Sequence, residues 1–170
     1  MAKHTLSVLV ENHPGVLSRV AGLFSRRGFN IDSLAVGVTE NKDISRMTII
    51  VDGDDYTVEQ VSKQLNKLID IIKIKQLDKA ESVSRELALI KVTATASTRA
   101  EIIQIVEIFR ANIVDVSKNT LTIEISGGTD KVTALEDMVR GFGIKEIVRT
   151  GTIAIDRGNK YIKVTNNNEE

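Results

Sequence analysis

Hydrophobic and polar positions alternate at the start of the chain and then change to a helical spacing. Residues 6–10 follow a period of two, which is the pattern of a β-strand buried on at least one face. Across 16–24 the apolar residues recur at steps of three and four, which predicts an amphipathic helix. Pro14 suits the first turn of this helix because its missing N–H would be unpaired there. Gly28 suits the left-handed position that ends a helix.

Two strands, a second helix and a third strand pattern follow. The apolar segments 31–38 and 45–51 flank the polar run TENKD, which predicts a β-hairpin. Thr57 and Gln60 have the spacing of a capping box in front of the second amphipathic helix. Residues 72–75 alternate isoleucine with lysine, as expected of an edge strand with one wet face. The predicted order is therefore βαββαβ.

The same order repeats in the second half of the chain. Its predicted elements are strands at 87–94, 113–116, 121–125 and 147–155, a helix capped by Thr98, and a helix capped by Thr129 or Asp130. The repeat predicts an α+β fold of two tandem ferredoxin-like βαββαβ domains, each an antiparallel sheet with helices on one face. We expect domains at 4–78 and 86–164, a polar linker at 79–85, and a disordered tail at 165–170.

Some strands carry apolar residues on both faces. Leu9 and Ile50 lie on the face opposite to the other apolar residues of their strands. A small domain with such a sheet is expected to cover its second face by pairing with another copy. The sequence therefore predicts a homodimer, with sheets joined edge to edge or face to face.

Composition excludes several classes of function. The 170 residues contain no cysteine, which excludes disulfides, thiolate catalysis and cysteine metal sites. The 23 Lys+Arg balance 23 Asp+Glu, and the only aromatic residues are four Phe and two Tyr, which disfavours nucleic-acid binding. No segment approaches the roughly 18 apolar residues of a membrane span, and the N-terminus lacks a signal-peptide pattern. We expect a cytoplasmic protein that binds neither nucleic acid nor membrane.

Catalytic and metal-binding patterns are not found in the sequence. His4 and His13 stand in neither an HExxH nor an HxH spacing, and no serine has the GxSxG context of a nucleophile. The acidic residues lie beside lysine or arginine, as on solvated helices. We therefore expect no catalytic residue, no metal site and no enzyme activity in this chain.

The loop between the first strand and the first helix is the strongest candidate for ligand binding. It opens a helix, whose first N–H groups can bind an anion, and Gly15 allows close approach to the backbone. Asn12 and Asn30 offer hydrogen bonds, Val16, Leu17 and Ile31 offer apolar walls, and a ferredoxin-like unit is expected to bring the two segments close. Such a set suits a small apolar amino acid. The alternative is purely structural: a helix cap at Asn12, a helix start at Pro14–Gly15, and core residues.

The segments ENHPGVLSRVAGLFSRRGFNIDSLAVG (11–37) and SRMTIIVDGD (45–54) closely resemble the ACT domain of acetohydroxyacid (acetolactate) synthase small subunits. IFRANIVDVS (108–117) is similar to the second domain of that family. The resemblance implies a non-catalytic regulatory subunit. Its partner is a catalytic large subunit that uses thiamine diphosphate, Mg²⁺ and FAD, and this chain holds none of these cofactors.

The resemblance also implies a site. A branched-chain amino acid, valine or else leucine or isoleucine, would bind between the ACT domains of two protomers and inhibit the partner by feedback. The effector residues carried over are Asn12, His13, Pro14, Gly15, Val16 and Leu17 of one chain with Asn30 and Ile31 of the other. Arg26, Arg27, Phe29 and Leu34 are the candidates for contact with the catalytic subunit. The alternative function is a stand-alone ACT-type amino-acid sensor that regulates another metabolic enzyme.

Overall fold

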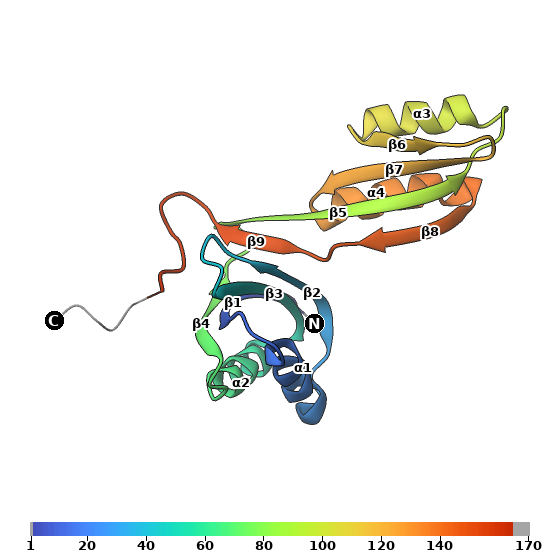
Figure 1. The fold of residues 1–170 in the computed structure, drawn as a ribbon. Helices are drawn as coiled ribbons and strands as arrows, with labels where there is room; N and C mark the ends of the chain where they lie inside the picture. The colour runs from blue at the N-terminus through green and yellow to red at the C-terminus, as the bar shows by residue number, and fades with distance from the viewer. Residues whose placement is uncertain (1, 165–170) are drawn as a thin grey trace. The chain divides into compact units, whose positions relative to one another are not determined.

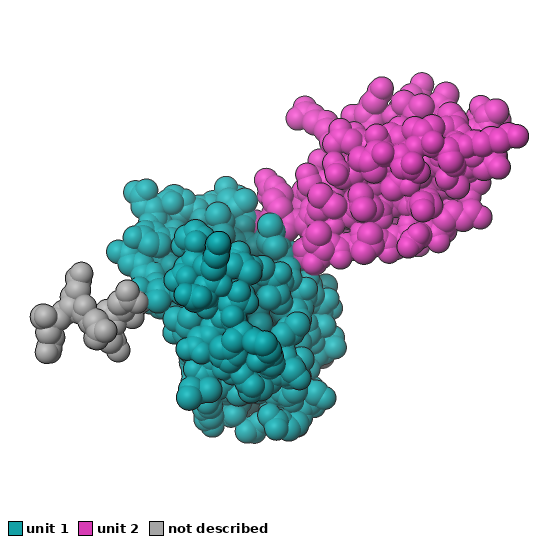
Figure 2. Space-filling model, viewed as in Figure 1, with its two compact units in different colours: residues 1–83, 152–170 teal, residues 84–151 magenta. Residues whose placement is uncertain are grey.

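The computed structural model describes residues 2–164 and divides them into two compact units. Unit 1 comprises the chain up to residue 83 together with the segment from residue 152 onward, and unit 2 comprises 84–151 (Figure 2). The predicted tail, 165–170, lies outside the described residues. No helix within 2–164 is long and apolar enough to cross a membrane.

Unit 1 has the predicted βαββαβ order. Its elements are β1 (Ala2–Glu11), α1 (Val16–Arg27), β2 (Ile31–Val38), β3 (Ile44–Gly53), α2 (Asp55–Leu65) and β4 (Ile71–Leu77). The strands form an antiparallel sheet in the order β2-β3-β1-β4, so β2 and β4 are its edges. Both helices cover one face of this sheet (Figure 1). The ferredoxin-like fold predicted from the sequence is confirmed.

The core of unit 1 lies between that face and the two helices. Its members alternate along the strands and recur at helical spacing along α1 and α2, because only those positions point toward the facing layer. They are Leu6, Val8, Val10, Val16, Val20, Leu23, Phe24, Met47, Ile49, Val51, Val58, Val61 and Leu65. Val16, predicted as a wall of the ligand site, is thus a core residue.

A C-terminal segment covers the other face of the same sheet. It begins with β9 (Ile153–Asp156), which pairs with β5 and lies against β1 and β4 (Figure 1). Leu9 and Ile50, on this second face, are buried within the single chain. Their burial therefore needs no second copy, and the face-to-face reason for predicting a dimer is wrong. The predicted second domain, 86–164, is also too long, because the segment from 152 belongs to unit 1.

Unit 2 repeats the topology with its own core. Its elements are β5 (Ser82–Thr93), α3 (Arg99–Ile108), β6 (Asn112–Val116), β7 (Thr120–Gly127), α4 (Thr129–Val139), a 3₁₀ turn (Arg140–Phe142) and β8 (Ile144–Arg149), with the strand order β6-β7-β5-β8. The strand β5 begins inside the predicted linker 79–85, and the predicted closing strand 147–155 is two strands, β8 and β9. The chain passes between the units at 83–84 and again at 151–152.

The helix ends differ from prediction at several caps. Asp54 caps α2 by accepting a 2.8 Å hydrogen bond from the Thr57 N–H, so Thr57 lies inside the helix. Gly128 occupies the cap position of α4, ahead of Thr129. Thr98 does precede α3, but its hydroxyl accepts from the Thr95 N–H instead of capping the helix. Short polar side chains can bond several nearby backbone groups, and spacing alone does not select among them.

Candidate functional site

Gly15 forms the bend that opens α1. Its φ of 90° lies in the left-handed region that glycine adopts without strain, and its carbonyl accepts the first helical bond from the Arg19 N–H. Pro14 therefore precedes the helix, and the prediction that it lies in the first turn is wrong. Among the described residues no side chain caps this N-terminus, so its first backbone N–H groups remain directed at the loop. Leu17, one residue into the helix, is 46% exposed beside them.

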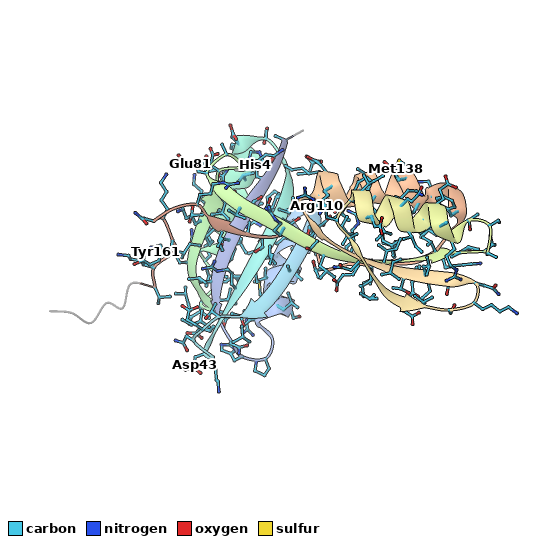
Figure 3. The ribbon with its side chains drawn as sticks, turned by 90° about the horizontal axis from the view of Figure 1, so that it is seen from above. His4, Asp43, Glu81, Arg110, Met138 and Tyr161 are labelled. Atoms are coloured by element: carbon cyan, nitrogen blue, oxygen red, sulfur yellow. The ribbon has the colours of Figure 1, made fainter. Side chains whose placement is uncertain are left out.

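Asn12 donates hydrogen bonds to the β2–β3 hairpin and does not cap α1. Its N–H donates to the Asp43 carbonyl at 2.8 Å, and its Nδ2 donates to the Lys42 carbonyl, also at 2.8 Å. Asp43 lies at the tip of the β2–β3 hairpin (Figure 3). The amide group of Asn12 thus fixes the position of the loop, and the structural interpretation of Asn12 as a helix cap is wrong.

A cluster of ion pairs next to the loop is formed by Glu11, His13, Arg19 and Asp70. The side chain of Asp70 is only 4% exposed and accepts from Arg19 Nε at 2.5 Å and from Arg19 Nη2 at 3.0 Å. His13 Nε2 lies 3.0 Å from Glu11 Oε2 and 3.1 Å from Asp70 Oδ1. The cluster thus links the loop, α1 and the turn before β4.

The surroundings favour charge on both His13 and Asp70. His13 Nδ1 faces the Pro14 carbonyl and Nε2 faces Glu11, two acceptors that favour a doubly protonated ring and raise the His13 pKa. The hydrogen bond from the Arg19 guanidinium is the largest cause of a lowered pKa at Asp70.

Three members of this cluster could in principle bind a metal ion, but their contacts indicate an ion-pair network. Glu11, His13 and Asp70 each offer a ligand atom, and these atoms lie within 4.8 Å of one another. The guanidinium of Arg19, however, already bonds both oxygens of Asp70. A protein cation thus neutralises the only buried carboxylate of the three, and we interpret the cluster as an ion-pair network.

Asn30 and Ile31 lie far from this loop within one chain. They follow the end of α1, whereas the loop precedes its start, and a helix of 12 residues is about 18 Å long. Strand register agrees: Ile31 is level with Val51 and His4, at the opposite end of the sheet from Glu11. The sequence expectation that one chain brings both segments together is wrong. Asn30 is exposed, and Ile31 packs partly against the core.

The four candidate partner contacts differ in accessibility. Arg26 and Arg27 are exposed in the last turn of α1, and Arg27 donates to Gln64 Oε1 at 3.0 Å. Phe29 packs on the core with its ring edge-to-face against Phe24, at 6.4 Å between centroids. Leu34 is also partly buried against the core. Of the four, only the two arginines are exposed on the surface of the unit.

Sequence reasoning missed Arg19 and Asp70. Arg19 lies four residues after Gly15 and one before core residue Val20, and Asp70 interrupts an isoleucine-rich run between Ile69 and Ile71. A lone carboxylate inside an apolar run is a usable signal, because burial of a charge requires a partner. Which cation serves as that partner depends on the packing of α1.

Residues 6–73 match the family described as AHAS small subunit-like ACT domain, and residues 85–158 match the family described as small subunit of acetolactate synthase.

Individual relatives extend the match over nearly the whole chain. A probable acetolactate synthase small subunit of Archaeoglobus fulgidus is 60% identical, over 93% of this chain and 99% of its own length. The acetolactate synthase small subunit of Mycobacterium bovis is 58% identical, over 94% of this chain and 95% of its own length. A crystal structure of the Thermotoga maritima small subunit is 45% identical with a TM-score of 0.88, covering 94% of this chain and 100% of its own. The chain therefore belongs to the acetolactate synthase small-subunit family.

Proposed function

We propose that this chain is a regulatory subunit that binds a branched-chain amino acid, most simply valine, between the ACT units of two protomers. The observation that carries the proposal is the uncapped N-terminus of α1 at Gly15, with the exposed side chain of Leu17 beside it. Helix N–H groups stabilise a carboxylate, and Leu17 provides apolar surface for an aliphatic side chain.

Two protomers are needed because the Gly15 loop and the segment Asn30–Ile31 lie at opposite ends of the sheet in one chain. Val38, at one end of edge strand β2, is level with Ser45 and Val10, near the loop, whereas Ile31 is at the other end. Antiparallel pairing of two β2 edges about a two-fold axis brings the Ile31 end of one chain toward the Val38 end of the other. Asn30 and Ile31 of the second chain would then approach the Gly15 loop of the first.

We place the chemistry in a partner, the catalytic large subunit, together with its thiamine diphosphate, Mg²⁺ and FAD. The regulatory chain would raise the activity of that subunit, and the effector would reverse the increase. An effector held by two chains stabilises one dimer arrangement, and inhibition follows if the catalytic subunit binds better to another. A coupling of about 1–3 kcal/mol gives roughly 5- to 150-fold regulation.

Reconstitution with the cognate catalytic subunit tests the proposal. Acetolactate formation is measured with the catalytic subunit alone, with this chain added, and with valine, leucine or isoleucine present. We expect activation by the chain and inhibition by at least one of the three amino acids. Activation without any inhibition would contradict the effector site. A chain that binds valine but neither captures nor activates a thiamine-diphosphate enzyme would favour the stand-alone sensor.

A further inference from the structure

A hollow lies on the second face of the unit 1 sheet, between the strands and the C-terminal segment. Its volume is about 600 Å³, within the range of small-molecule sites. Ser7, Arg46 and Leu77 line it from β1, β3 and β4, and residues of the segment 155–162 line the other side. This face is opposite to the one that α1 and α2 cover (Figure 1). The residues that line the hollow include none of the Gly15 loop, so the two are separate.

Two buried polar atoms of this hollow lack a partner. Within the described residues 2–164, Ser7 Oγ and Arg46 Nε form no hydrogen bond although each is buried. Ser7 as a whole is 1% exposed. A buried donor without a partner costs about 1–3 kcal/mol, so most native structures pair such groups. Both side chains line the same hollow, from the neighbouring strands β1 and β3.

The charges around the hollow favour an anion. Lys75 pairs with Asp156 at 2.8 Å, and Lys160 pairs with Glu81, so these cations are already compensated. Arg46 has no carboxylate within ion-pair distance in the part of the chain that the structure describes. A planar guanidinium matches the geometry of a carboxylate or a phosphate group.

The remaining lining is suited to an organic group. Leu77, which is 5% exposed, lines the hollow from the sheet. Ile155 and Ile162 line it from the C-terminal segment. Tyr161 projects from the same segment beside the sheet (Figure 3). A second hollow, of about 450 Å³, shares Arg46, Tyr161 and Ile162 with the first, so both cavities reach Arg46.

We propose that this hollow binds a small organic anion through Arg46 and Ser7. The acid group, a carboxylate or a phosphate, accepts from Arg46 Nε and from the Ser7 hydroxyl. The organic part packs on Leu77, Ile155 and Ile162. The site uses no residue of the proposed effector loop and does not depend on the proposed function.

Titration of the full-length chain by protein NMR tests the proposal. The probes are isobutyrate, inorganic phosphate and phenyl phosphate, each compared with sodium chloride at equal ionic strength. Isobutyrate tests the carboxylate, and the two phosphates separate the acid group from the organic part. We expect saturable shifts at the Ser7 amide, at Arg46 Nε and in 155–162, with at least one organic probe binding more tightly than inorganic phosphate.

Charge-removing variants distinguish the site from a general salt effect. Arg46→Gln should weaken the best probe about tenfold or more, because a charge-assisted hydrogen bond is lost. The matched control Arg157→Gln removes an exposed charge from the same segment, outside the lining, and should leave binding unchanged. Ser7→Ala provides a second test if Arg46→Gln fails to fold.

Three outcomes would overturn the proposal. One is the absence of saturable shifts with all three probes. Another is shifts that map only to the Gly15 loop. The third is equal affinity in the wild type, in Arg46→Gln and in Ser7→Ala.

Discussion

At the scale of single residues, Gly15 determines whether the loop can approach a ligand. Its φ of 90° strains any residue with a side chain, and an added Cβ would lie 3.1 Å from the Arg19 guanidinium. A side chain here would also fill the space above the helix N–H groups.

We expect Gly15→Asp to abolish valine binding while activation of the catalytic subunit is retained. The aspartate places a negative charge against the effector carboxylate and occupies its space. Gly15→Ala carries the same backbone strain without the charge and should weaken binding less. Calorimetry with valine measures both. Equal affinity of Gly15→Asp and the wild type would show that the site assignment is wrong.

His13 gives unit 1 a pH dependence whose sign follows from its contacts. The Pro14 carbonyl and the Glu11 carboxylate raise the His13 pKa above its ordinary value of 6.5. A group whose pKa is raised by folding stabilises the fold at low pH, and the contribution is lost as pH rises through the raised value.

The free energy of unfolding of the wild type, relative to His13→Gln, should therefore fall between about pH 6 and about pH 8. Urea unfolding of both proteins at the two pH values measures the difference. A difference that stays constant, or that grows with pH, would contradict the assigned contacts.

At the scale of elements, one ion pair connects helix α1 to the turn before β4. Arg19 bonds both oxygens of the buried Asp70 and keeps the pKa of that carboxyl below its ordinary value of 3.8. Loss of the guanidinium leaves a buried carboxylate whose one remaining cationic partner among residues 2–164 is His13. Such a change affects the position of the whole loop, since His13 is part of the loop.

Arg19→Gln should lower the urea midpoint at neutral pH. The effect should diminish as pH falls through the lowered pKa of Asp70, because protonation removes the charge that Arg19 compensates. Lys63→Gln is the control, since it breaks an exposed pair with Glu59 and should have little effect. Equal midpoints for Arg19→Gln and Lys63→Gln would contradict the role assigned to Arg19.

At the scale of the whole molecule, the two units have separate cores, but unit 2 is one continuous segment whereas unit 1 is built from two segments. Unit 2 closes its core within 84–151. In unit 1 the segment 152–164 lies over the second face of the sheet, where Leu9 and Leu77 are buried beside it.

A fragment 84–151 should therefore unfold cooperatively, and the predicted longer domain 86–164 should unfold at nearly the same temperature. A fragment 1–83 should instead expose the second face of its sheet and associate. Calorimetry and light scattering measure these properties. A fragment 1–83 that stays monomeric and melts like the full chain would show that the segment is not needed as a cover.

The full chain should still form a dimer, through its edge strand. Val36 and Val38 are 46% and 58% exposed on β2, which leaves an apolar edge after the second face has been covered. Light scattering at micromolar concentration should give twice the chain mass. A Val38→Lys variant should shift the mass toward the monomer, whereas Val164→Lys, a similar change outside the edge, should not. A monomeric wild type would remove the proposed two-chain site.

The elements, the repeated topology and the family follow from local patterns and motifs along the chain. Alternation in 6–10 and the stripe across 16–24 identify β1 and α1, because a side chain's face depends on local backbone geometry. Gly28 could be assigned to the end of α1 for the same reason, and the structure confirms its left-handed conformation. The position of the Gly15 loop between a strand and a helix likewise predicts a candidate ligand site.

The contacts between distant segments could not be read from the sequence. Leu9 lies beside residues 161–164, and Arg19 pairs with Asp70, 51 residues further along the chain. Within residues 2–164, Arg46 Nε has no hydrogen-bond partner. Strand register likewise placed Ile31 at the far end of the sheet from the loop. Local periodicity specifies which face a residue occupies, whereas the group that meets that face depends on the packing of the whole chain.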